Sequence, residues 1–164
     1  RQATVGLGLN EINETGCAWV VLNWQMKIIR RPAYNDELTV YTWSTSADKL
    51  FAERDFRITD KNGETIVIAT SRWLYMDINR RRPVRITPEI MDRYESEPET
   101  HVFTEKVNRI DPPDTGYIEI PYNILRRDVD YLGHMHNISY LDAAYDVMPE
   151  EYFNGPQFNF VSIE

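Results

Sequence analysis

The sequence predicts an α+β protein in which a large antiparallel sheet is accompanied by few helices. Three observations support this prediction: four long strand-like segments in the first half, a polar linker rich in proline, and a second half that reads strand, polar turn, helix, strand. With 164 residues, 42% of them hydrophobic, the chain can bury a sizeable core as one domain or as two small units that share a sheet.

The first strand is expected over residues 18–31, where apolar and polar residues alternate. The sequence PAYND at 32–36 ends this strand, because proline and the polar residues after it favour a turn. The next segment, LTVYTWSTS at 38–46, is rich in β-branched and aromatic residues and is expected to form the second strand. One side of the first strand is expected to carry the apolar residues Val20, Leu22, Trp24, Met26 and Ile28.

Two further strands flank the tripeptide Lys61-Asn62-Gly63. They are KLFAERDFRITD at 49–60 and ETIVIATSRWLYMDI at 64–78. The Asn-Gly pair tolerates the positive φ values of a tight turn and is therefore a strong hairpin signal. We expect the four strands to follow one another as an antiparallel meander.

A short helix is expected from Pro88 to about Tyr94, because Thr87 is a suitable N-cap and proline is favoured at the first helical position. The polar segment 96–116 follows; it contains three of the nine prolines. This segment is typical of a linker, with a short strand expected near residues 101–107.

The strand-like pattern begins again after the linker. Residues 117–125, YIEIPYNIL, are expected to form a strand, in which Pro121 favours an edge position or a bulge. A helix ending near Pro149 and a strand within 158–164 are expected next. The helix is expected to bury one face, formed by Ile138, Leu141, Ala144, Tyr145 and Met148.

These patterns predict three parts of the chain: a first unit over residues 1–95, a linker over 96–116 and a second unit over 117–164. Both ends read as cut. The first unit is expected to lack its first strand and most of its helix, and the second unit is expected to be truncated.

Composition and charge exclude some classes of protein. The formal charge is −8 and the pI is near 4.9, whereas a general nucleic-acid binder is normally basic over its contact face. The single Cys17 has no partner for an intrachain disulfide, and beside Trp19 it is more typical of a small core residue than of a nucleophile. No leader and no span of about 18 apolar residues is visible, so we expect a cytoplasmic protein without a membrane segment.

The polar stretch RRDVDYLGHMHNISY at 126–140 precedes the last helix. Asn137 is a candidate N-cap, which leaves backbone N–H groups and the positive end of the helix dipole facing the turn. Gly133 permits a positive φ or the close approach of a ligand. Such a helix end attracts anions, including the oxyanion that develops when a carbonyl is attacked, and the candidate N–H donors are those of Gly133, Met135 and His136.

Asp130 and His134 are the candidate reacting side chains of this stretch. Asp130 can supply a carboxylate base or nucleophile, and His134 can donate a hydrogen bond or shuttle a proton. This combination suits acyl transfer or hydrolysis, but an ordinary capped helix start explains the same residues equally well. No further histidine or cysteine cluster is present to close a zinc site around His134, His136 and Asp130, so neither a metal nor another cofactor is expected.

The run DVDYLGHMHNISY at 128–140 resembles the acyl-ACP thioesterase signature D-x-D-x-N-x-H-V-N-N-x-x-Y. The upstream order AWVVLNWQMKIIRRP, VYTWS, RDFRITDKNGE and ATSRWLYMDINRRRP also resembles the N-terminal half of this family. The resemblance implies a tandem hotdog fold, in which an antiparallel sheet wraps around long helices in two units. It also implies hydrolysis of fatty acyl-ACP without a metal, as a step of fatty acid biosynthesis.

The resemblance assigns roles to three residues of the turn. Asp130 matches the catalytic aspartate, His134 matches the family's histidine, and Asn137 matches the second of the paired asparagines, which implies a capping or orienting role. Two departures remain. Leu132 stands where the family has an asparagine, and the family's later acidic or cysteine residue would lie beyond Glu164.

The resemblance also implies an apolar slot for the acyl chain, mainly in the first unit, and a contact with acyl carrier protein. The candidates for the slot are Trp24, Trp43, Trp73 and Met76, although ordinary packing in the core explains these residues as well.

The carrier is acidic like this chain, so docking requires basic residues. The candidates are Arg80, Arg81, Arg82, Arg85, Arg126 and Arg127. A hotdog acyl-CoA thioesterase and a non-catalytic protein that binds acyl chains or a carrier are the alternatives, and a homodimer is one option for assembly.

Overall fold

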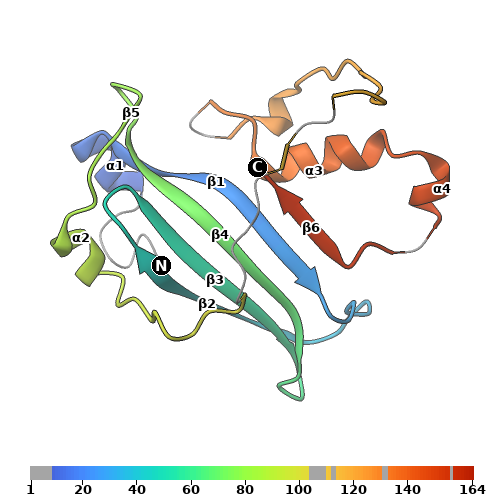
Figure 1. Cartoon of the computed structure of the whole chain (residues 1–164), viewed down its shortest axis with the longest axis horizontal. Helices are drawn as coiled ribbons and strands as arrows, with labels where there is room; N and C mark the ends of the chain where they lie inside the picture. Colours follow the sequence, from blue (N-terminus) through green and yellow to red (C-terminus); the bar gives the residue numbers. More distant parts are fainter. Residues whose placement is uncertain (1–8, 104–109, 112–113, 131–132, 156) are drawn as a thin grey trace. The chain divides into compact units, whose positions relative to one another are not determined.

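The computed structural model describes residues 9–103, 110–111, 114–130, 133–155 and 157–164 (Figure 1). The chain divides into two compact units. One runs to Ile110 and includes Phe158–Glu164, and the other runs from Asp111 to Gln157. The predicted division into a first unit over residues 1–95, a linker over 96–116 and a second unit over 117–164 stays a prediction.

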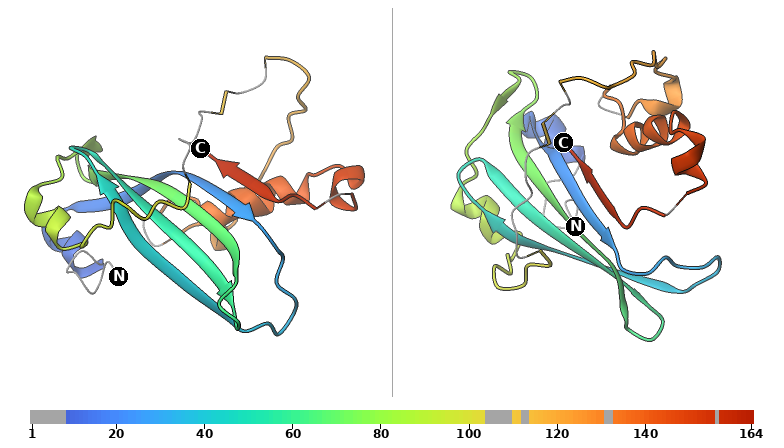
Figure 2. Two further views of the ribbon diagram at one scale, coloured as in Figure 1. Left: turned by 60° about the horizontal axis from the view of Figure 1, so that its bottom comes forward. Right: turned by 45° about the vertical axis from the view of Figure 1, so that its right-hand side comes forward.

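The first unit is built on one antiparallel sheet with the strand order β2-β3-β4-β1-β6, and the short β5 pairs with the end of β4. Figures 1 and 2 show the long strands β1 to β4 lying side by side, with α1 and α2 near one end of the sheet. The predicted long strands and the predicted final strand are confirmed. The elements are α1 (Leu9–Thr15), β1 (Cys17–Ile28), β2 (Leu38–Ala47), β3 (Phe51–Asp60), β4 (Thr65–Asp77), β5 (Arg82–Pro83), α2 (Pro88–Asp92) and β6 (Phe160–Ile163).

The position of β1 differs from the predicted meander. β1 pairs with β4, so that β1 and β2 lie on opposite sides of the β3–β4 hairpin. In the segment that leaves β1, the N–H groups of Ile29 and Arg30 donate to the carbonyl of Ile66 at 2.8 and 3.1 Å. Arg30 Nη2 also donates to Oδ2 of Asp60 at 2.6 Å. These bonds hold the chain against the end of the hairpin while it crosses from β1 to β2.

A β-bulge in β1 changes which residues share a side of the sheet. The register shifts between Val21 and Asn23, which places one extra residue on β1. Trp24 therefore lies on the same side as Trp19 and Val21, and not on the side of Val20. The prediction that Val20 and Trp24 lie on one apolar side of the strand is therefore wrong, because the bulge separates them.

The hairpin turn between β3 and β4 forms where the Asn-Gly pair predicts it. Gly63 has a φ of +81°. Oδ1 of Asp60 accepts the N–H groups of Asn62 and Glu64 at 2.9 and 3.0 Å. Asp60 is 9% exposed, so one buried carboxylate joins the hairpin turn to the Arg30 side chain that follows β1.

The predicted short helix is confirmed as α2, which begins at Pro88 after an extended Thr87 and ends at Asp92. The chain then runs along β2 and β3. The N–H of Glu97 donates to the carbonyl of Ser44 at 2.8 Å, and that of Val102 donates to Oδ2 of the buried Asp55 at 2.7 Å. Residues 101–103 form no strand, and most of the strand predicted near 101–107 lies outside the described residues.

The second unit contains η1 (Arg126–Asp128), α3 (Asn137–Asp146) and α4 (Glu150–Phe153). The predicted helix is confirmed as α3, although it ends before Pro149, which precedes α4. The strand predicted over residues 117–125 is wrong, because these residues have no ladder partner in the described part of the chain.

The face of α3 that was predicted to be buried is exposed. Ile138, Leu141 and Tyr145 are 59, 42 and 54% exposed, and the buried residue of this helix is Ser139. The prediction assumed a sheet wrapped around the helix, whereas the described residues of the second unit form no sheet.

Candidate active site

The turn between η1 and α3 is closed by a ladder of backbone hydrogen bonds. The N–H of His136 donates to the carbonyl of Asp128 at 2.6 Å, and the N–H of Asp130 donates to the carbonyl of His134 at 2.8 Å. At the tip, the N–H of Gly133 donates to the carbonyl of Asp130 at 3.1 Å. Gly133 has a φ of +80°, which is the conformation that favours glycine here.

The carboxylate of Asp130 lies beside the main chain of His134. Its Oδ1 accepts the N–H of His134 at 3.1 Å, a bond strengthened by the charge of the acceptor. Asp130 is half-buried and His134 is exposed. The structure therefore brings the two predicted reacting residues together and leaves the imidazole open to a ligand.

The N-cap of α3 is His136, and the predicted cap at Asn137 is wrong. His136 is extended, with a φ of −64° and a ψ of 138°, and its Nδ1 accepts the N–H of Ile138 at 3.2 Å. Asn137 is the first residue of the helix and is exposed. A neutral imidazole that accepts at Nδ1 carries its proton on Nε2. His136 stands where the family signature has the first of its paired asparagines. This match is the feature of the sequence that could have indicated His136 as the N-cap.

The predicted oxyanion donors divide into two groups. The N–H groups of Gly133 and His136 already donate to carbonyls within the turn, so they are not available to a ligand. Met135 faces Val129 across an antiparallel bridge in a non-hydrogen-bonded pair, whose N–H groups point away from the ladder. The backbone N–H groups of Met135 and Asn137 make no hydrogen bond to any described residue, and that of Asn137 belongs to the first turn of α3.

Leu132 lies outside the described residues, so the departure from the family signature at this position rests on the sequence. No group of three or more His, Cys, Asp or Glu side chains in the described ranges is placed to hold a metal ion. Every helix of the described chain is too short or too polar to cross a membrane.

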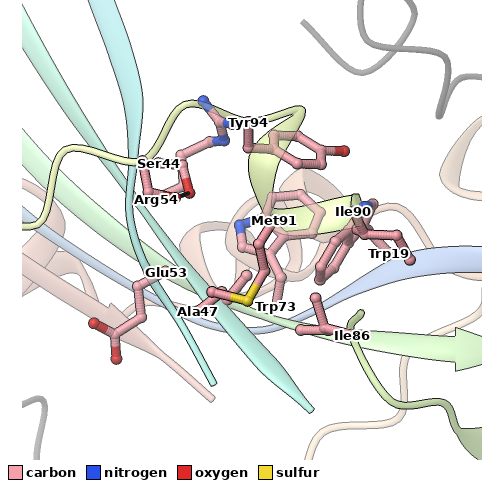
Figure 3. A pocket seen from close by; sticks show the side chains of 12 residues that line it. Trp19, Ser44, Ala47, Glu53, Arg54, Trp73, Ile86, Ile90, Met91 and Tyr94 are labelled. Carbon is pink, nitrogen blue, oxygen red and sulfur yellow. Dashed lines mark hydrogen bonds between the residues drawn. The ribbon is translucent and has the colours of Figure 1, made fainter. Parts of the chain in front are cut away.

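A small, largely apolar cavity lies in the first unit between the sheet and α2 (Figure 3). Its volume is about 40 Å³. Trp19 and Trp73 contribute from β1 and β4, Ile90 and Met91 from α2, and Tyr94 from the chain just after α2. Ser44, Ser96, Glu53 and Arg54 supply polar groups to its lining.

The four predicted acyl-slot residues do not meet in this cavity. Trp73 lines it. Trp24 stacks on Phe56 with ring centroids 4.9 Å apart, the Trp43 indole donates to a linker carbonyl at 3.0 Å, and Met76 pairs with β5. Trp24, Trp43 and Met76 therefore do not line this cavity, and their role in an acyl slot stays a prediction.

Trp19 is the principal cavity residue that the sequence did not indicate. Its ring lies 4.9 Å from that of Tyr75 and 5.9 Å, edge to face, from that of Tyr94. An uninterrupted alternation along the first strand places Trp19 on the side opposite Trp24. The bulge reverses this relation, and nothing in the sequence marks the bulge.

The basic residues form two groups, one in each unit. Arg80, Arg81, Arg82 and Arg85 are exposed along the chain between β4 and α2, and Arg80 Nε lies 3.8 Å from Oδ2 of Asp77. In the second unit, Arg126 and Arg127 are exposed on η1. Each group is open to solvent within its own unit.

The family model of the acyl-ACP thioesterase N-terminal domain matches residues 1–94. The chain is 26% identical over 157 residues to the chloroplastic oleoyl-acyl carrier protein thioesterase 2 of Arabidopsis thaliana, covering 89% of this chain and 42% of the relative. It is 28% identical over 145 residues to the chloroplastic palmitoyl-acyl carrier protein thioesterase of the same plant, covering 85% and 35%. The chain thus spans less than half the length of these curated relatives.

Solved structures match nearly the whole chain. A protein from Lactobacillus plantarum assigned as an oleoyl thioesterase superposes with a TM-score of 0.80 at 26% identity, covering 98% of this chain and 63% of the other. The 12:0-ACP thioesterase of Umbellularia californica gives a TM-score of 0.79 at 21% identity, covering 98% and 66%. These matches confirm the predicted hotdog fold.

Proposed function

Since the chain belongs to the acyl-ACP thioesterase family, we propose that the protein hydrolyses the thioester between a fatty acyl group and acyl carrier protein, releasing the free fatty acid. The observation that carries this proposal is the turn in which the Asp130 carboxylate accepts the N–H of His134 at 3.1 Å beside the first turn of α3. The names of the relatives, which are oleoyl- and palmitoyl-acyl carrier protein thioesterases, support the substrate class.

In the proposed reaction, Asp130 takes a proton from a water molecule as the water oxygen attacks the thioester carbonyl carbon. The electron pair of the carbonyl moves to its oxygen, and the N–H groups of Met135 and Asn137 at the helix end stabilise the oxyanion. Collapse of this intermediate breaks the carbon–sulfur bond. The proton taken by Asp130 goes to the departing thiolate, and the exposed imidazole of His134 hydrogen-bonds the reacting group during the transfer. The products are a fatty acid and the carrier thiol.

The cavity beneath α2 is proposed to receive the end of the acyl chain. Trp19, Trp73, Ile90 and Met91 provide apolar surface for methylene and methyl groups. A cavity of about 40 Å³ holds a chain end and not a whole fatty acyl group. The aromatic rings of Trp19 and Tyr94, which line the cavity and contact each other edge to face, would therefore limit the length of the acyl chain.

The exposed arginines between β4 and α2 are proposed to dock the acidic carrier protein. The chain as a whole carries −8, so an unselective approach of two acidic proteins is repulsive, and a local basic group supplies the attraction. The two arginines of η1 stand immediately before the signature turn and are the second candidate for this contact. A homodimer and a cytoplasmic location stay predictions.

Parallel hydrolysis assays on matched acyl-ACP and acyl-CoA test the proposal. We expect faster release of fatty acid from acyl-ACP, and loss of this release in Asp130→Asn, which keeps the shape of the side chain but removes its charge. Equal or faster hydrolysis of acyl-CoA would favour a hotdog acyl-CoA thioesterase. Tight binding of acyl-ACP by the wild type without turnover would overturn the proposed catalysis and favour a binding protein, the alternative that Leu132 suggests.

A further inference from the structure

Asp128, the first aspartate of the signature, is buried although its side chain is polar and it lies at the end of the short helix η1. It is 5% exposed. Its Oδ2 accepts the N–H of Leu125 at 2.7 Å and the hydroxyl of Tyr122 at 3.1 Å. Its Oδ1 lies 3.9 Å from Nε of Arg127. The carboxylate thus ties the chain before η1 to the end of η1.

The main chain of Asp128 is also part of the turn that carries Asp130. Its carbonyl accepts the N–H of His136, the N-cap of α3, at 2.6 Å. This bond is the first rung of the ladder, and the bond between Asp130 and His134 is the next. A displacement of Asp128 therefore shifts one side of the ladder relative to the other, and the Asp130 carboxylate moves with it.

We propose that Asp128 is a positioning residue, which holds the signature turn in the geometry that places Asp130 and His134 side by side. Its carboxylate is covered by Tyr122 and the Leu125 main chain, so it does not meet the substrate. The consequence for turnover rests on the proposed thioesterase function. The consequence for the geometry of the turn does not.

Tyr122 is suited to the role of permanent donor. Partial loss of water around its hydroxyl, together with the hydrogen bond to the Asp128 carboxylate, raises the pKa of Tyr122 above its ordinary value of 10, although the residue as a whole is exposed. The hydroxyl therefore keeps its proton throughout the physiological pH range, and the bond to Oδ2 persists.

Three variants of the full chain separate positioning from chemistry. Asp128→Ala removes both acceptor bonds, Tyr122→Phe removes one, and Asp128→Asn keeps an oxygen that accepts from both donors. We expect kcat on acyl-ACP to fall by about 10- to 100-fold in Asp128→Ala, because a misplacement of about 1 Å at a reacting group has an effect of this size. KM should stay within about twofold of the wild-type value, as when an interaction acts only in the transition state. Asp128→Asn should restore most of kcat, and Tyr122→Phe should lie between.

Amide hydrogen exchange, resolved by residue with NMR, tests the positioning without any assay of turnover. In Asp128→Ala the turn loses the bonds that Leu125 and Tyr122 make to the Asp128 carboxylate. We therefore expect the turn to open more often, and exchange at the N–H groups of His134 and His136 to rise by about tenfold or more. Asp128→Asn should exchange like the wild type. The control is Asp55→Ala, which removes another buried carboxylate that accepts a backbone N–H, in the first unit. It should lower the melting temperature without changing exchange in the turn.

The two measurements fail in different ways. Unchanged exchange at His134 and His136 in Asp128→Ala overturns the positioning role, whatever the activity. A wild type that hydrolyses no acyl thioester, with exchange that still rises in the variant, overturns the proposed function and leaves the positioning role standing. If Asp128→Ala does not fold, Tyr122→Phe decides, because unchanged exchange in that variant would contradict the proposal.

Discussion

His134 and Asp130 are joined by two hydrogen bonds that both use the main chain of His134. Its N–H donates to Oδ1 of Asp130 at 3.1 Å, and its carbonyl accepts the N–H of Asp130 at 2.8 Å. The imidazole is therefore not needed for these two bonds, and its nitrogens make no hydrogen bond to any described residue, so they can serve the proposed reaction.

This arrangement predicts that His134→Ala lowers kcat on acyl-ACP without disturbing Asp130. Loss of a side chain that assists proton transfer costs about 10²- to 10⁴-fold in rate. The melting temperature should change little, because both bonds between His134 and Asp130 use backbone groups of His134. Steady-state kinetics and thermal unfolding of the same preparation provide the measurement. A kcat within twofold of the wild-type value would exclude the imidazole from the mechanism.

A second prediction concerns Gly133, whose φ of +80° is costly for any residue with a Cβ. An alanine Cβ at this position would meet no atom within 4 Å, so the cost of Gly133→Ala is conformational and about 1 kcal/mol in the free energy of unfolding. Gly116→Ala is a matched control, because Gly116 has the same φ and equally open surroundings. Urea unfolding should show similar losses in both variants, whereas kcat should fall in Gly133→Ala alone. Equal kcat values in the two would show that the tip of the turn tolerates displacement.

Much of the site can be predicted from local sequence rules, and the errors of the prediction have identifiable causes. Asp130 and His134 are four residues apart around a glycine, so a tight turn brings them together whatever the rest of the fold does. The sequence predicts Asn137 as the N-cap because asparagine is a common capping residue, whereas the cap in the structure is His136. Histidine caps a helix only when its Nδ1 is unprotonated and turned toward the N–H of Ile138, and side-chain orientation cannot be read from the sequence.

The fold shows the same division between local and non-local information. Alternation and the Asn-Gly pair fix each strand and the β3–β4 hairpin, which depend on neighbouring residues. The pairing of β1 with β4, the bulge after Val21 and the absence of a strand at 117–125 depend on partners far along the chain. A strand-like pattern indicates that a segment is able to pair in a sheet, but whether it pairs depends on the strands that the fold places beside it.

The cavity beneath α2 gives a third prediction. Ala47 lines this cavity, and Ala47→Leu adds three carbon atoms to it. The ratio of kcat/KM for longer to shorter acyl-ACP substrates should fall by about tenfold or more, since one methylene in an apolar pocket is worth about 10- to 200-fold. Val40→Leu, on the same strand but 62% exposed and not among the cavity residues, should leave the ratio unchanged. An unchanged ratio in Ala47→Leu would mean that the chain end lies elsewhere.

The proposed docking of the carrier gives a fourth prediction. Arg81→Glu should raise KM for acyl-ACP severalfold at low ionic strength, and the effect should shrink as added salt screens exposed charges. Lys61→Glu makes the same change in net charge in the turn between β3 and β4, at the other end of β4 from β5, and is the matched control. Identical KM increases in the two variants would indicate general repulsion and would remove the arginines from the docking surface.

The last prediction concerns acid stability and Asp60. Burial opposes the charge of this carboxyl, but the N–H groups of Asn62 and Glu64 and the guanidinium of Arg30 outweigh that effect and hold the pKa of Asp60 below its ordinary value of 3.8. A depressed pKa in the folded state contributes stability above the unfolded-state pKa, and this contribution is lost as the pH falls through the folded-state value. The free energy of unfolding of the wild type should therefore fall more steeply below about pH 4 than that of Asp60→Asn, when both are measured by urea unfolding between pH 7 and pH 3.

Arg30→Leu separates the sources of this effect, because it removes the guanidinium and keeps both backbone donors to Oδ1. Its pH dependence should lie between those of the wild type and Asp60→Asn. Added salt should weaken the Arg30 contribution more than that of the backbone bonds, since the Arg30 side chain is 44% exposed and its charge is partly screened. Parallel curves for the wild type and Asp60→Asn would show that Asp60 has the same pKa in the folded and unfolded chain. The contacts between the hairpin turn and the chain after β1 would then stabilise the sheet independently of pH.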